Sequence, residues 1–188
     1  GNYGVITFNT ATINNLAGGL ITSDIGAVYA NGFTLTLTNA GTITGGQYNG
    51  VSTTVGGTIT NQLGGVINAM PAGGWGILGQ GATTVANAGT INADSGVASG
   101  GTVTLTNTGT INGTVNGLLS YNNGVFNVTN SGTISASNAT AGRGMNLAGA
   151  NNVVVNQAGG AISGWRGVEL AANAGGSTLT NAGSITGV

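Results

Sequence analysis

Short apolar runs recur along the chain in a fixed relation to asparagine and glycine. The clearest unit is Asn39-Ala40-Gly41-Thr42-Ile43. Similar segments occupy 87–91, 107–111, 130–134 and 181–185, and three copies with additional residues occupy 15–21, 61–67 and 156–162. The leading asparagines follow one another at intervals of 24, 22, 26, 20, 23, 26 and 25 residues. A repeat period in the twenties is typical of solenoid proteins.

Each period contains three strand-like segments separated by turns rich in glycine and asparagine. One period reads Leu35-Thr36-Leu37-Thr38, then Thr42-Ile43-Thr44, then Gly50-Val51. Successive strand side chains point to opposite faces, so threonine alternating with an apolar residue gives one polar and one apolar face. Strands that repeat in sequence are expected to stack in parallel on their counterparts. The pattern predicts an all-β chain: one right-handed three-sided parallel β-helix (β-solenoid) over 1–188, with about eight coils of 20–26 residues.

Two ladders of equivalent residues are expected to run along this solenoid. The core ladder consists of Ile21, Ile43, Ile67, Ile91, Ile111, Ile134, Ile162 and Ile185. The structural asparagine ladder consists of Asn15, Asn39, Asn61, Asn87, Asn107, Asn130, Asn156 and Asn181. An asparagine at the same corner of every coil can hydrogen-bond to its copies. Asparagine and glycine also tolerate the positive φ that sharp corners are expected to require, and Pro71 is expected in a turn.

The composition excludes several classes of function. The chain has two arginines, three acidic residues, no histidine and no cysteine, and its net charge is −1. This charge supplies no long-range field for nucleic acid. The absence of cysteine excludes disulfides and thiolate metal sites. No cofactor and no membrane span are expected, because converging carboxylates and a long apolar run are both absent.

An enzyme is not expected either, although several β-helix families act on polysaccharides. Glycoside hydrolysis uses two carboxyl groups roughly 5–9.5 Å apart. Asp24 and Asp94 fall at the same corner of the predicted solenoid but three coils apart, a separation of roughly 14 Å at the strand spacing. Glu169 belongs to a different strand. We therefore predict no catalytic residues.

One local cluster is a candidate patch for a partner. Arg143 and Arg166 align one coil apart, with Trp165 and Glu169 beside them. Two arginines next to a tryptophan could hold an anionic sugar or an acidic surface. The alternative is a solvated corner in which Glu169 compensates the arginine charge.

Outward threonines suggest another alternative, an ice-binding surface. Threonine pairs at 36/38, 58/60, 104/106 and 178/180 would form ladders on one flat face. Against this, threonine is a common solvent-side residue of strands. The ladders are also interrupted at Ala86, Asn127, Val153 and Val155.

The coil pattern continues in phase from the end of the chain to its beginning. Placed end to end, Ile185 would precede Val5 by eight residues, as Ile43 precedes Val51. Asn181 would precede the next Asn15 by 22 residues (7 + 15), within the observed range. We expect the rod to continue at both ends as a segment or repeat unit of a longer fibre. Copies of the chain are therefore the expected partners.

The repeats at 36–43, 104–111 and 128–134 resemble those of bacterial autotransporter passenger domains and filamentous-haemagglutinin-type adhesins. The resemblance covers essentially the whole chain. It implies a β-helix at the bacterial cell surface that works in adhesion, aggregation or biofilm structure, with a host surface, a neighbouring cell or polysaccharide as a further partner. No catalytic motif of these families is present. The sequence therefore favours a structural shaft or fibre subunit, with an ice-binding solenoid and a polysaccharide-binding or polysaccharide-degrading β-helix as alternatives.

Overall fold

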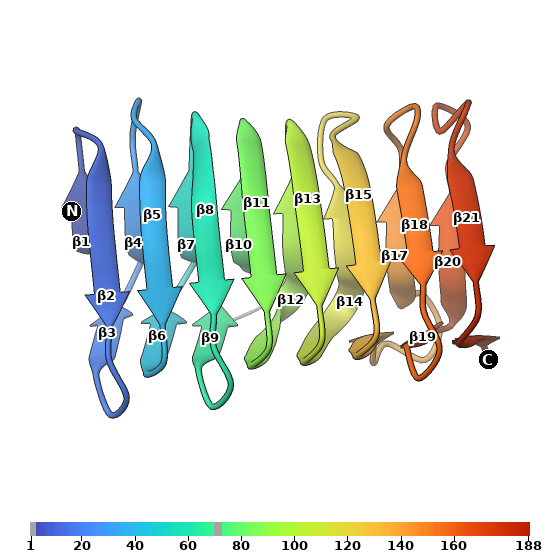
Figure 1. Ribbon diagram of the computed structural model, residues 1–188, viewed down its shortest axis with the longest axis horizontal. Helices are drawn as coiled ribbons and strands as arrows, with labels where there is room; N and C mark the ends of the chain where they lie inside the picture. The colour runs from blue at the N-terminus through green and yellow to red at the C-terminus, as the bar shows by residue number, and fades with distance from the viewer. Residues whose placement is uncertain (1–2, 70–72) are drawn as a thin grey trace.

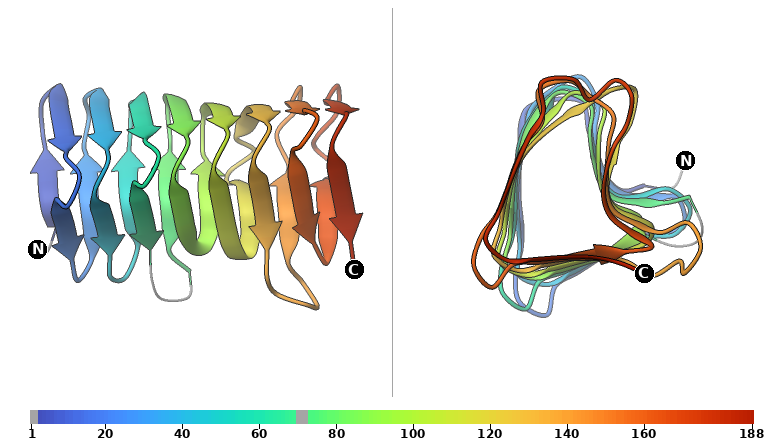
Figure 2. Two further views of the ribbon diagram at one scale, coloured as in Figure 1. Left: turned by 60° about the horizontal axis from the view of Figure 1, so that its bottom comes forward. Right: turned by 90° about the vertical axis from the view of Figure 1, so that its right-hand side faces the viewer.

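The chain winds into a rod made of β-strands. The computed structural model describes residues 3–69 and 73–188, and these contain 22 strands and no helix that could cross a membrane. In Figure 1 the front strands run down and the rear strands run up as the chain advances from N to C, which is a right-handed coil. Viewed along the rod, the coils enclose a triangle (Figure 2). The predicted three-sided parallel β-solenoid is confirmed. The turn expected at Pro71 lies outside the described residues.

Each coil contributes one strand to each of three faces. The first face contains β1 (Tyr3–Thr7), β4 (Gly26–Ala30), β7 (Asn49–Thr53), β10 (Trp75–Gly79), β17 (Arg143–Leu147) and β20 (Arg166–Leu170). The second face contains β2 (Ala11–Asn15), β5 (Leu35–Asn39), β8 (Gly56–Asn61), β11 (Ala82–Asn87), β13 (Thr102–Asn107), β15 (Val125–Asn130), β18 (Val153–Asn156) and β21 (Thr178–Asn181). The third face contains β3 (Leu20–Ser23), β6 (Thr42–Gly45), β9 (Val66–Ala69), β16 (Thr133–Ala136), β19 (Ala161–Gly164) and β22 (Ser184–Gly187). The long strands β12 (Thr90–Ser99) and β14 (Thr110–Ser120) turn the corner from the third face to the first.

The core is a set of columns parallel to the rod axis. In the column of motif isoleucines every residue pairs in register with its neighbours, and all but Ile21 and Ile185, in the two end coils, are buried. The second face supplies an equivalent column that includes Leu37, Ile59 and Val85. Each side chain packs against the residue at the same position of the neighbouring coils, which is isoleucine throughout the first column and leucine, isoleucine or valine in the second.

The first face contains one strand that the sequence pattern did not predict. In β4, Ala27 stands where the other first-face strands carry glycine, so the glycine signal is lost. The side chain of Ala27 is nevertheless fully buried. This position on the first face has room only for a small side chain, and alanine is small enough to fit there.

The expectation that the sharp corners require positive φ is wrong at the short copies of the motif. The glycines of the longer copies, Gly18, Gly64 and Gly159, have φ of 78°, 83° and 84°. In the short copies, exemplified by Gly109, φ is not positive. Instead, a side chain at Gly109 would overlap the carbonyl oxygen of Gly89 in the preceding coil. That oxygen accepts a hydrogen bond from the backbone N–H of Thr110 at 2.9 Å, so it cannot move aside.

The Gly109→Ala substitution therefore tests whether coil stacking requires this glycine. All three nearest atoms to the added methyl group are backbone atoms, so we expect a loss of about 1–3 kcal/mol in the free energy of unfolding. Gly175→Ala is the matched control, because its methyl group meets nothing within 4 Å and its φ is not positive. Chemical denaturation should show the control unchanged or slightly more stable. Equal stability of the two variants would contradict the stacking argument.

Candidate functional site

The asparagine ladder is a continuous hydrogen-bonded column at the corner between the second and third faces. In each coil Asn Nδ2 donates to Asn Oδ1 of the following coil, with all seven distances at 2.7 or 2.8 Å. The same nitrogen also donates to backbone carbonyls of the corner. For Asn87 these are the oxygens of Gly89 at 3.3 Å and Thr110 at 3.2 Å. From Asn15 to Asn156 the column is buried, so these bonds satisfy the polar groups of the interior.

The ladder has a direction. The amide nitrogen faces backbone carbonyls, which only a donor can satisfy, so nitrogen and oxygen cannot exchange places. Every ladder bond consequently points toward the C-terminal end. Among the described residues no donor reaches Oδ1 of Asn15, and Nδ2 of Asn181 reaches only the carbonyl of Gly183, at 3.3 Å. Within this part of the chain the column therefore ends in an acceptor, Oδ1 of Asn15, and a donor, Nδ2 of Asn181, that both lack a ladder partner.

A second polar ladder lies on the outer side of the third face and was not predicted. Ser135 donates to Asn112 and Asn112 donates to Asn92, each at 3.0 Å. Asn92 then donates to Asn68, also at 3.0 Å. These bonds point toward the N-terminal end, opposite to the buried ladder. The asparagine that follows the motif isoleucine in three successive coils was the available sequence signal.

The second face carries two outward columns that contain most of the expected threonines. The first column consists of Thr12, Thr36, Thr58, Thr84, Thr104, Asn127, Val153 and Thr178. The second consists of Asn14, Thr38, Thr60, Ala86, Thr106, Thr129, Val155 and Thr180. The four expected pairs are in register. The first column is unbroken from Thr12 to Thr104, but the second column is interrupted inside that run.

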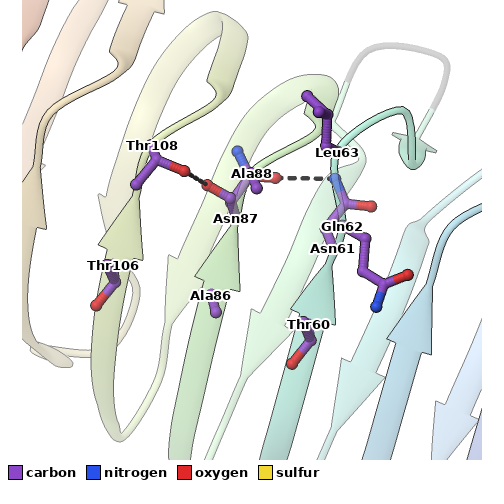
Figure 3. A pocket seen from close by; sticks show the side chains of 9 residues that line it. All are labelled: Thr60, Asn61, Gln62, Leu63, Ala86, Asn87, Ala88, Thr106 and Thr108. Carbon is purple, nitrogen blue, oxygen red and sulfur yellow. Dashed lines mark hydrogen bonds between the residues drawn. The ribbon is translucent and has the colours of Figure 1, made fainter.

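A hollow lies beside the interruption, as Figure 3 shows. Ala86 lies between Thr60 and Thr106 on one side of a depression of about 500 Å³ that extends to Gln62 and Leu63. Leu63, in the exposed turn between β8 and β9, stands at the rim. The lining contains no charged residue. The hollow makes the threonine face uneven at its centre.

The candidate partner patch is a compact ion cluster. Arg143 and Arg166 are register partners on β17 and β20. Nε of Arg143 and Nη1 of Arg166 both bond to Oε2 of Glu169, the latter at 2.8 Å. The guanidinium of Arg166 also lies 4.4 Å from the ring centroid of Trp165, a cation–π contact. The structure thus brings the four predicted residues together, in a geometry that favours the charge-compensated corner.

The carboxylates do not assemble into a larger site. Among residues 3–69 and 73–188 there is no group of three acidic, histidine or cysteine residues that could hold a metal ion. Within the same residues, Glu169 is the one carboxylate that forms an ion pair.

No family model, no curated protein and no solved structure matches this chain. The resemblance to autotransporter passengers and filamentous-haemagglutinin-type adhesins therefore rests on the repeat motifs.

Asn87→Ala tests what the buried ladder contributes. The substitution removes the partner of Asn61 Nδ2 and leaves Oδ1 of Asn107 without its donor. A buried polar group left unpaired costs about 1–3 kcal/mol, and we expect a loss of that size in chemical denaturation. Asn112→Ala is the control, because Asn112 makes the same two ladder bonds on the solvent side. Asn112→Ala should lower the free energy of unfolding by much less than Asn87→Ala does. Equal decreases would show that burial does not determine how much a ladder contributes to stability.

Glu169→Gln tests the ion cluster through its pH dependence. The hydrogen bond from Arg166 lowers the pKa of Glu169, partial burial opposes this, and the hydrogen bond and charge of Arg143 lower the pKa further. Because the pKa of Glu169 is lower in the folded protein, its ionised carboxylate stabilises the fold at pH values above the ordinary pKa of 4.5. This stabilisation is lost as the pH falls through the pKa of the folded protein. At pH 7 we expect the variant to be less stable by under about 1 kcal/mol, since the cluster is partly exposed.

The measurement is the thermal midpoint of both chains as a function of pH. The difference should shrink as pH falls below the ordinary value of 4.5 and disappear once pH is below the lowered pKa of Glu169. Asp24→Asn serves as the control, because it removes a carboxylate that forms no ion pair with the described residues. A difference that persists unchanged into acid would exclude the ion cluster as its cause.

Proposed function

We propose that this chain is a structural shaft or fibre subunit of a filament at a bacterial cell surface, extended by stacking of its coils. The observation that carries the proposal is the directional asparagine ladder. Its terminal acceptor at Asn15 and its terminal donor at Asn181 are complementary. A coil placed in register on either end would continue the column with the same bond that joins all the coils within the chain.

The apolar columns support the same arrangement. Leu179 is 42% exposed in the last coil, whereas its register partner Val154 is 1% exposed. Leu170 is 48% exposed and its partner Leu147 is fully buried. At the other end, Val5 and Ile13 are only partly buried. One further coil at either end would cover these side chains, and burial of apolar area is the main driving force for association. The neighbouring coil can belong to a second copy or to the same chain in a tandem repeat.

The surface composition suits a fibre. Only five of 188 residues are charged, so neighbouring rods repel one another weakly and lateral bundling is favourable. Aggregation and biofilm structure are the proposed settings. The extracellular location and the kinship with autotransporter adhesins belong to this proposal and are supported by the repeat motifs. Adhesion to a host surface or a neighbouring cell would use side chains on the outer faces.

The threonine columns favour the shaft over an ice-binding surface. Both columns carry threonine in only four of the eight coils, those with the pairs 36/38, 58/60, 104/106 and 178/180. The hollow at Ala86 separates the second and third of these pairs. A regular lattice of hydroxyl groups therefore does not extend along the rod.

Electron microscopy and fibre diffraction of the purified chain test the proposal. We expect long, thin, unbranched filaments with an axial spacing of about 4.8 Å and a longer repeat of about 38 Å for eight coils. Discrete short rods at high protein concentration would contradict stacking between copies.

A pair of substitutions on β21 identifies the interface. Leu179→Lys places a charge on the surface that a stacked coil would bury, and burying an unpaired charge is strongly unfavourable. It should abolish the filaments. Thr180→Lys places the same charge on the outer side of the same strand and should leave them intact. If the Leu179→Lys variant still forms filaments, the end coils are not the contact between copies.

A further inference from the structure

The aromatic residues of this chain gather on the outside of the first face. The chain contains two tryptophans, four tyrosines and three phenylalanines. All four tyrosines and Trp75 lie on this face or in its turns, and they come from five different coils. The rings of Tyr3 and Tyr29 stack at 5.1 Å, and those of Trp75 and Tyr121 meet at 5.0 Å with a tilt of 51°.

These rings form a groove. A depression of about 410 Å³ is bounded by Tyr3, Tyr29, Tyr48 and Trp75, with Ser52 and Leu78 beneath. Its volume is in the range of small-molecule sites, which are mostly apolar with a few polar groups. The groove spans the first four coils, a length of about 14 Å at the strand spacing. It is long enough for several rings of an extended ligand.

The structural role of the rings does not account for the groove. The rings of Trp75 and Tyr121 pack on each other, which is ordinary aromatic packing. Tyr48, in contrast, is 59% exposed and makes no ring contact within the described part of the chain. The ring of Tyr48 therefore stands in water beside Trp75, where it is available to a partner.

The polar groups of the groove indicate the chemistry of that partner. The lining contains no charged residue. The side-chain amides of Asn49 and Gln80 line the groove, and neither takes part in a hydrogen bond within residues 3–69 and 73–188. A carboxamide both donates and accepts, and so does a hydroxyl group. A proline-rich peptide would offer mainly acceptors, because proline has no N–H.

We propose that this groove binds a neutral glycan chain of β-linked pyranose rings. The equatorial hydroxyl groups of such a chain lie around the ring edge and leave both ring faces apolar. The ring faces pack on Tyr48 and Trp75, and the hydroxyl groups bond to Asn49 and Gln80. The rod would then hold polysaccharide along its side while its ends remain available for stacking.

Tryptophan fluorescence provides a direct test. In the Trp165→Phe variant, Trp75 is the one tryptophan left and reports on the groove alone. Titration with cellohexaose and with chitohexaose should produce a saturable change in its emission for at least one of the two. Tyr48→Ala in the same background should weaken binding by about tenfold through the loss of one stacking surface.

Phe33→Ala is the matched control, because Phe33 is an exposed aromatic residue that does not line the groove. It should leave the affinity unchanged. Gln80→Ala provides a second test of the groove at an exposed side chain, should Tyr48→Ala fail to fold. It should also weaken binding.

Three outcomes would overturn the proposal: no saturable change with either oligosaccharide, equal binding by the Tyr48→Ala and Phe33→Ala variants, or tighter binding of a decaproline peptide. A change in emission that depends on protein concentration in the absence of sugar would also overturn the proposal. It would indicate that this face forms contacts between copies of the chain. The titrations are carried out in the Leu179→Lys background, which should not form filaments, so these outcomes are separate from the test of stacking.

Discussion

The stacking of each coil on the one before it is the constraint on which the whole structure depends. Strands pair only between coils, so no coil can satisfy its backbone hydrogen bonds alone. Every residue that faces a neighbouring coil must therefore fit the residue at the equivalent position of that coil, at the strand spacing of about 4.8 Å. Isoleucine on isoleucine and asparagine on asparagine meet this condition in every coil, and glycine meets it where two backbones approach closely.

The buried asparagine column shows how polar groups fit this rule. An amide can donate to the next copy and accept from the previous one, so one residue type satisfies the corner in all coils. Because the donors all point the same way, the rod has a polarity that its apolar columns do not create. A corner built from hydrophobic residues would leave the carbonyls of Gly89 and its equivalents without these donors.

The outer surface is free of the stacking rule and carries the differences between coils. The three faces have separate characters: aromatic rings on the first, threonine on the second, and a hydrogen-bonded asparagine series on the third. The ion cluster of Arg143, Arg166 and Glu169 is a further local feature of the first face. In a solenoid the scaffold is repeated and function depends on such departures from the repeat.

The sequence by itself determined the fold class, the number of coils and the register, because period-two alternation within strands and a recurring motif between them leave one consistent stacking. It also identified the asparagine and isoleucine columns. The tertiary structure decided what does not repeat. It showed that Gly109 is required by close approach of two backbones and not by its φ. It also brought Tyr3, Tyr29, Tyr48 and Trp75 together from four coils. Tyr3 and Trp75 hold equivalent positions, each two residues before the core residue of its first-face strand, but Tyr29 and Tyr48 do not. No single periodic signal therefore links the four rings, and only folding shows that they share a surface.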